Sequence, residues 1–87
     1  MVRALTELRI FYGQEADIID FLRENGSITT MQAFGIGVAR LASRVFDMRT
    51  KGVNLQKEMV AVKNRKGETC RVARYAIPGG VPEYYRT

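Results

Sequence analysis

The sequence predicts a single α+β domain in which three helices are followed by a β-hairpin. Apolar residues recur at helical spacing as far as Gly52, where the pattern changes. Beyond Gly52, two segments rich in valine, tyrosine and threonine are typical of strands. With 87 residues, 46% hydrophobic and 26% charged, the chain has room for one domain with a modest core.

Residues 14–25, QEADIIDFLREN, predict the first helix, with its apolar and charged residues on different sides. Asn25 and Gly26 mark its end, with Gly26 in the left-handed conformation. Four acidic residues are interpreted as the solvated face of this helix rather than as a catalytic acid–base pair: Glu15, Asp17, Asp20 and Glu24.

The second helix is short and ends near Gly35. Thr29 and Gln32 fit a capping box, which favours Thr29 as the N-cap, while Ser27 is an alternative N-cap. Gly35 and Gly37 then predict a sharp turn, because glycine adopts conformations that other residues avoid. We expect Ile36, between the two glycines, to fill the interior.

Residues 38–51, VARLASRVFDMRTK, predict the third helix, closed by Gly52. Apolar residues at helical spacing form a core stripe: Val38, Leu41, Val45 and Met48. A second face is polar and carries two arginines: Arg40, Ser43, Arg44 and Asp47.

Residues 55–63 and 69–77 predict the two strands of the hairpin. The loop KNRKGE joins them, with Asn64 and Gly67 as turn formers, so the hairpin has a basic tip. We expect two residues of the second strand to belong to the core: Tyr75 and Ile77.

The ends of the chain show less pattern. Residues 1–13 form an N-terminal extension in which ELRIFY fits a strand, an extra helical turn or a dimer contact. Residues 14–77 form the domain, and residues 78–87 are expected to be a flexible tail because they lack periodicity. Tyr84 and Tyr85 in this tail either contact a partner or hang free.

Helix, short helix, tight turn, longer helix and hairpin is the element order of a winged helix-turn-helix, whose last helix enters a DNA major groove. The segment from GSITTMQAF to RVARYAI also resembles a small family of such domains found mainly in phages and prophages. The likeness covers residues 14–77 and is carried by SIT, RLASRVFDMRTKG and VARY. One departure is Val38, where a polar residue or another cap is expected. The resemblance implies DNA binding in a regulatory or recombination-accessory role.

Charge is distributed unevenly along the chain, whose formal net charge is +5. Residues 1–35 carry a net charge of −2, whereas residues 36–74 hold ten Lys and Arg against three acids, a net charge of +7. This asymmetry favours one surface that faces an anion.

We therefore predict that helix 38–51 contacts bases and that wing residues 63–68 contact phosphates. The candidate DNA-binding residues are Arg40, Ser43, Arg44, Lys63, Asn64, Arg65, Lys66 and Arg71. As alternatives, these charges form solvated faces, or Arg44 pairs with Asp47 or Glu58. Arg49 and Lys51 lie near the end of the helix, where complementing the helix dipole is as good an explanation of their charge as contact with DNA.

Two classes of function fit these features. The first is a sequence-specific double-stranded DNA-binding protein, a phage or prophage transcriptional regulator or recombination accessory factor, which would bind a two-fold site as a homodimer. The second is a protein-interaction module that docks on an acidic host or phage protein. Double-stranded RNA is less suited, because a helix cannot enter its deep, narrow major groove.

The composition argues against catalysis. There is no histidine, and Cys70 is the only cysteine, so neither a Cys/His nucleophile pair nor a Cys/His zinc site can form. The sequence GIG lacks the third glycine of a dinucleotide-binding motif and follows a helix. We expect no enzyme activity, cofactor or metal. No apolar run approaches the roughly 20 residues that span a bilayer, and we expect a bacterial cytoplasmic location with Cys70 reduced.

Overall fold

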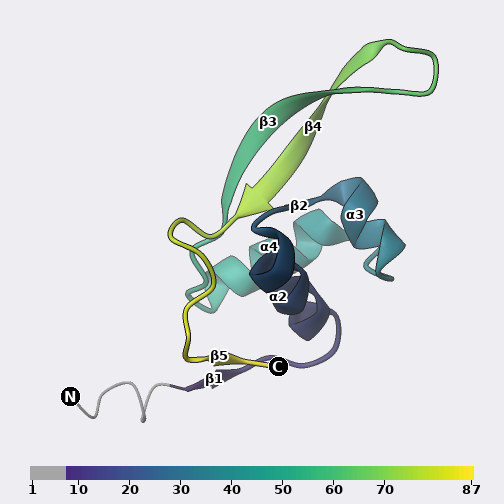
Figure 1. Cartoon of the computed structure of the whole chain (residues 1–87). Coiled ribbons are helices and arrows are strands. Elements are labelled where there is room, and N and C mark those ends of the chain that lie inside the picture. The colour runs from purple at the N-terminus through teal and green to yellow at the C-terminus, as the bar shows by residue number, and fades with distance from the viewer. Residues whose placement is uncertain (1–7) are drawn as a thin grey trace.

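The structure, a computed structural model, describes residues 8–87. Within this range, three helices pack against a three-stranded antiparallel sheet, and a second, two-stranded sheet joins segments near the two ends (Figure 1). The long hairpin of the larger sheet projects away from the helices. The predicted α+β class with three helices and a hairpin is therefore confirmed, although additional short strands modify the element order.

The first helix, α2 (Gly13–Asn25), confirms the prediction for residues 14–25. Its buried face consists of Ile18, Ile19 and Leu22. Gly26 ends the helix in the left-handed conformation, with φ 85°, and its N–H donates to the carbonyl oxygen of Leu22 at 2.8 Å. The apolar stripe and the terminal glycine thus set both the orientation and the length of α2.

The second helix, α3 (Thr30–Gly35), has the predicted capping box. The Thr29 hydroxyl accepts the Gln32 N–H at 3.3 Å, and the Gln32 Oε1 accepts the Thr29 N–H at 2.9 Å. Thr29, rather than Ser27, is therefore the N-cap.

The turn after α3 depends on one of its two glycines. Gly37 has φ 91°, a conformation that favours glycine, whereas Gly35 is the last residue of α3 and has no positive φ. The prediction that Gly35 is also needed for the turn conformation was wrong. Ile36 is half-buried and packs against the core, as expected.

The third helix, α4 (Leu41–Thr50), is shorter than the predicted 38–51. The N–H of Val38 donates to the Ala33 carbonyl of α3 at 2.8 Å, so Val38 belongs to the turn. Arg40 is the N-cap residue, with φ −127° and ψ 68°, so its predicted place inside the first helical turn was wrong. The core stripe is confirmed, since its four residues are all buried: Val38, Leu41, Val45 and Met48.

The larger sheet has the strand order β2-β4-β3. The predicted hairpin is confirmed as β3 (Gln56–Lys63) and β4 (Thr69–Ala76), which pair antiparallel over eight residues each. The additional strand, β2 (Ile28–Thr29), lies between α2 and α3 and pairs with Tyr75 and Arg74. The three helices are therefore interrupted by a strand, which differs from the predicted order. The strand β2 was not predicted, because two residues are too few to give a strand periodicity. The core also includes Tyr75 and Ile77, as expected.

The two described ends pair with each other. Strand β1 (Arg9–Ile10) runs parallel to β5 (Tyr85–Arg86), at the end of the body opposite the hairpin tip (Figure 1). Tyr85 is only 3% exposed, and its ring lies 5.0 Å from that of Phe11. Residues 78–87 are thus not a flexible tail: burial of the Tyr85 ring fixes them to the domain. The strand alternative for ELRIFY is confirmed at Arg9–Ile10, while residues 1–7 of the predicted extension lie outside the described residues.

Candidate nucleic-acid interface

The exposed face of α4 is centred on Phe46, whose side chain is 66% exposed. The other exposed residues of this helix are three or four positions away from it and surround it: Ala42, Ser43, Arg49 and Thr50. Phe46 was not predicted as a surface residue, because apolar helix residues are usually buried. Its position relative to the Leu41, Val45 and Met48 stripe was the available signal, since Phe46 lies on a different side of the helix.

Arg40 lies at the amino end of α4 and is exposed. Its carbonyl accepts the Arg44 N–H at 3.1 Å, which is the first helical hydrogen bond, and its side chain makes no capping bond. Ser43 is exposed one turn further along. Arg40 and Ser43 are therefore accessible on the amino-terminal half of α4.

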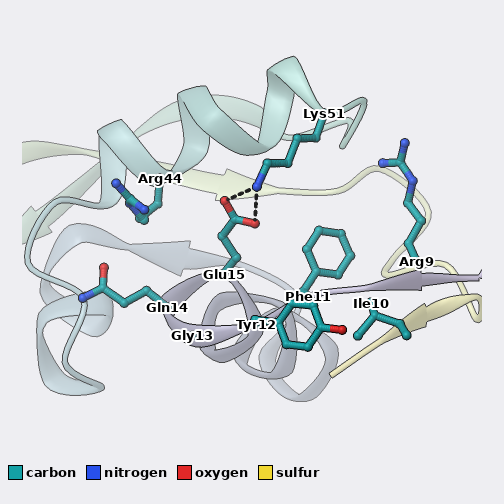
Figure 2. Close-up of a pocket in the computed structure, with 9 residues that line it drawn as sticks. All are labelled: Arg9, Ile10, Phe11, Tyr12, Gly13, Gln14, Glu15, Arg44 and Lys51. Carbon is teal, nitrogen blue, oxygen red and sulfur yellow. Dashed lines mark hydrogen bonds and ion pairs between the residues drawn. The ribbon is translucent and has the colours of Figure 1, made fainter.

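Arg44 does not share that surface. It is half-buried beside the apolar stripe, and its Nη2 lies 3.4 Å from Oδ2 of Asp47. It borders a hollow of about 530 Å³ between α4, the start of α2 and β1, and Figure 2 shows it on the same side of α4 as Lys51. The predicted single face shared by Arg40, Ser43 and Arg44 was wrong, because Arg44 faces the body. Pairing with Asp47, one of the alternatives, is confirmed.

Two cations near the end of α4 are used within the fold. Nε of Arg49 donates to the Leu55 carbonyl at 2.8 Å, which ties α4 to the segment just before β3. Nζ of Lys51 lies 3.0 Å from both carboxylate oxygens of Glu15 in the first turn of α2 (Figure 2). Glu15 is accordingly an ion-pair partner, not a fully solvated residue as we expected.

The Asn64 side chain builds the tip of the hairpin. Its Oδ1 accepts the N–H groups of Lys66 and Glu68 at 2.9 and 3.0 Å, and its Nδ2 donates to the Glu68 carboxylate at 3.2 Å. Gly67 completes the turn with φ 80°. Asn64 is confirmed as a turn former, and these internal bonds occupy the side chain predicted to contact DNA. The nearby basic side chains are all exposed: Lys63, Arg65 and Lys66.

The two faces of the hairpin differ in chemistry. Residues opposite each other in the ladder share a face, so Arg71, opposite Ala61, lies with Lys63, opposite Thr69. The other face carries apolar residues: Val60, Val62, Cys70 and Val72. Near the base, Arg74 pairs with Glu58, the residue that was the other predicted partner of Arg44. The exposed Arg71 thus extends the basic tip along one face.

Comparison with protein families fits this architecture. A sequence model of the winged helix-turn-helix domain matches residues 13–78, from the start of α2 to just past β4. The chain belongs to the winged helix-turn-helix domain family. Searches of curated proteins and of solved structures found no match.

In this winged helix-turn-helix domain, α3, the turn at Gly37 and α4 form the helix-turn-helix, and β3 with β4 forms the wing. Such a domain suggests DNA binding. The β1–β5 pair includes residues on both sides of the matched region.

Two other features are absent from the described residues. In the part of the chain from residue 8 onward, no group of three or more His, Cys, Asp or Glu side chains is placed to hold a metal ion. No helix in that part is both long and apolar enough to cross a membrane. Cys70 is a free, half-buried thiol on the wing.

Proposed function

We propose that this protein binds specific double-stranded DNA, with α4 in the major groove and wing residues 63–68 on the phosphates. The observation that carries the proposal is the uncovered face of α4, which begins at Arg40 and continues to Thr50. A helix of this width fits a major groove, where base edges are distinguishable. The exposed cations of the wing tip supply the complementary charge for the sugar–phosphate backbone.

The regulatory part of the proposal rests on the sequence. The likeness to winged helix-turn-helix domains of phages and prophages supports a transcriptional regulator or a recombination accessory factor. We place its action in the cytoplasm of a bacterial host, without enzyme activity or a cofactor. The residues proposed to contact DNA are the N-cap residue of α4 and one residue of that helix, Arg40 and Ser43, together with four residues of the wing: Lys63, Arg65, Lys66 and Arg71.

A homodimer on a two-fold site is part of the same proposal. Strand β1 and its neighbours support the dimer. One edge of β1 pairs with β5, and three apolar side chains in or beside β1 are exposed: Leu8, Ile10 and Tyr12. Apolar surface of this kind favours a second copy of the chain. Sedimentation equilibrium at tens of micromolar, with and without DNA, tests the dimer, and a monomer in both conditions would refute it.

Protein docking is the second candidate, and a different surface favours it. Met31 and Phe34 are exposed on α3. Met31 borders a groove of about 380 Å³ that also includes Val62 and Val72 of the wing. An apolar groove beside a basic hairpin would suit a protein that is acidic around an apolar contact.

Binding to random duplex DNA over a range of salt concentrations decides between these functions. If about five phosphates are neutralised, the logarithm of the association constant should fall with the logarithm of salt at a slope of roughly −4 to −5. Fluorescence anisotropy with a labelled random duplex measures this slope. A flat dependence, or no binding at micromolar protein in low salt, would remove the DNA function and favour protein docking.

A further inference from the structure

The surface around Phe46 has an unusual chemistry for the exposed face of a helix. The four residues surrounding the ring supply a methyl group at Ala42, hydroxyls at Ser43 and Thr50, and one cation at Arg49. The Arg49 guanidinium is partly engaged by the Leu55 carbonyl. The centre of this face is therefore an aromatic ring with three small neighbours and Arg49, and the other long cation of the helix, Arg44, lies on another side.

An exposed phenylalanine on the outer face of α4 would be stabilised by contact with an apolar group. Burying an apolar side chain is favourable by an amount proportional to the area removed from water, and the Phe46 ring stays largely in water in the free protein. The four base pairs present hydrogen-bonding groups in the major groove together with one apolar group, the C5-methyl of thymine. A recognition helix centred on an aromatic ring is thus matched to that methyl group.

We propose that Phe46 determines specificity by packing against a thymine C5-methyl group, with the Ala42 methyl beside it. This inference rests on the proposed DNA function and adds the chemical group that α4 recognises. Cytosine has a hydrogen at C5 in place of this methyl group, and an N4 amine in place of the thymine O4, so it would leave the ring without an apolar contact. The protein then distinguishes thymine from cytosine without an arginine at this position.

The composition of the face favours DNA over a second protein as its partner. Protein interfaces bury about 800 Å² on each partner around a cluster of apolar anchors. On α4 the single ring is bordered by Ser43, whose hydroxyl can bond to a base edge or a phosphate, and by Thr50, whose hydroxyl donates to the Asp47 carbonyl at 2.6 Å. The exposed Met31 and Phe34 side chains on α3 are the better match to a protein contact.

Replacing thymidine by deoxyuridine in the DNA tests the inference, since their bases, thymine and uracil, differ only in the C5-methyl group. A binding site is first selected from a random duplex pool, and each of its thymines is then replaced singly. For the unchanged protein, one or two positions should lose about fourfold in affinity, the factor for one buried methyl-sized group. Phe46→Ala should weaken binding to the thymine site by at least as much and should no longer distinguish thymine from deoxyuridine there.

Phe34→Ala is the matched control, because Phe34 is an aromatic residue of nearly equal exposure, 68%, on the neighbouring helix. It should keep the full thymine preference, and Phe46→Leu should keep part of it. If the unchanged protein binds every deoxyuridine site as tightly as the parent site, or if Phe46→Ala retains the preference, the inference is overturned while DNA binding stands. Failure to bind any duplex would overturn the proposed function as well.

Discussion

Lys51 at the end of α4 is bonded to Glu15 in the first turn of α2, with its Nζ 3.0 Å from each carboxylate oxygen. The Glu15 side chain is only 12% exposed, whereas that of Lys51 is 58% exposed. The pair therefore links the start of α2 to the end of α4, with β2 and α3 between them in the chain, and it occupies a lysine that would otherwise count among the DNA-facing charges.

Lys51→Ala should destabilise the domain by about 1 kcal/mol, because the largely covered Glu15 carboxylate would lose its cation. For a domain of this size, that corresponds to a fall in melting temperature of about 4–8 °C. Lys57→Ala removes an exposed lysine of the wing and should change the melting temperature little. Equal melting of the two variants would show that the Lys51–Glu15 pair contributes nothing to stability.

Tyr85→Ala should be far more damaging than Tyr84→Ala, although the two residues are neighbours. Tyr85 is buried against Phe11, and its carbonyl accepts a 2.7 Å bond from Nη2 of Arg23, whereas Tyr84 is 36% exposed. Removing a buried aromatic ring costs about 3 kcal/mol or more. Urea denaturation of both variants measures the difference, and similar midpoints would contradict the docking of the C-terminal segment.

Tyr85 should also make stability depend on alkaline pH. Burial raises the pKa of the Tyr85 hydroxyl, the nearby Tyr84 raises it further, and Arg9 opposes the shift. The folded pKa therefore lies above that of an unfolded tyrosine, which is about 10. The stability that comes from keeping the Tyr85 hydroxyl protonated in the folded state is fully present below pH 10 and is lost as pH rises through the folded pKa. Between pH 9 and pH 11, the free energy of unfolding should therefore fall less for Tyr85→Phe than for the parent protein. An identical loss in both proteins would refute this role of Tyr85.

Features that depend on local patterns were predictable from the sequence. The Thr29–Gln32 capping box involves residues three positions apart, and the α2 and α4 core stripes follow the helical repeat. The hairpin followed from its β-rich segments and the turn residues Asn64 and Gly67. In each case the residues that cause the structure are neighbours in the chain.

Features that depend on contacts between distant segments were not predictable. Tyr85 is ordered by Phe11, which lies far away in the sequence, so the tail carried no periodicity of its own. Arg44 seemed to share a face with Arg40 only because α4 was expected to begin at residue 38. Since the helix begins at Leu41, Arg40 is not part of its helical repeat. The helix α4 and the hairpin were thus predictable as elements, whereas the side chains that reach their surface were not.

The wing lysines should act through charge alone. Lys63→Ala combined with Lys66→Ala should weaken binding to selected and random DNA alike, and should reduce the magnitude of the salt slope by about 0.9 for each phosphate that is no longer neutralised. Melting should stay near that of the parent, because both side chains are exposed and the turn is held by Asn64. Anisotropy titrations at several salt concentrations give both quantities, and an unchanged slope would place the phosphate-binding residues elsewhere.

Arg40 and Arg44 provide the sharpest comparison on α4, because replacing either by alanine removes one positive charge. Arg40 is exposed at the start of the recognition helix, where residues usually reach base edges. An arginine there can donate two hydrogen bonds to guanine O6 and N7, worth about 1–3 kcal/mol of discrimination. Arg44 faces the body and is paired with Asp47.

Arg40→Ala should therefore reduce the ratio of selected-site to random-DNA affinity by about fivefold to 150-fold, while much of the random-DNA affinity remains. Arg44→Ala should leave that ratio nearly unchanged, since its guanidinium does not lie on the exposed face around Phe46. Competition titrations with the selected site and random duplex measure both ratios, with melting curves as a check on folding. If Arg44→Ala removes the preference and Arg40→Ala does not, α4 must present to DNA the side that borders α2, and the assignment of Phe46 to the groove-facing surface would then be reversed as well.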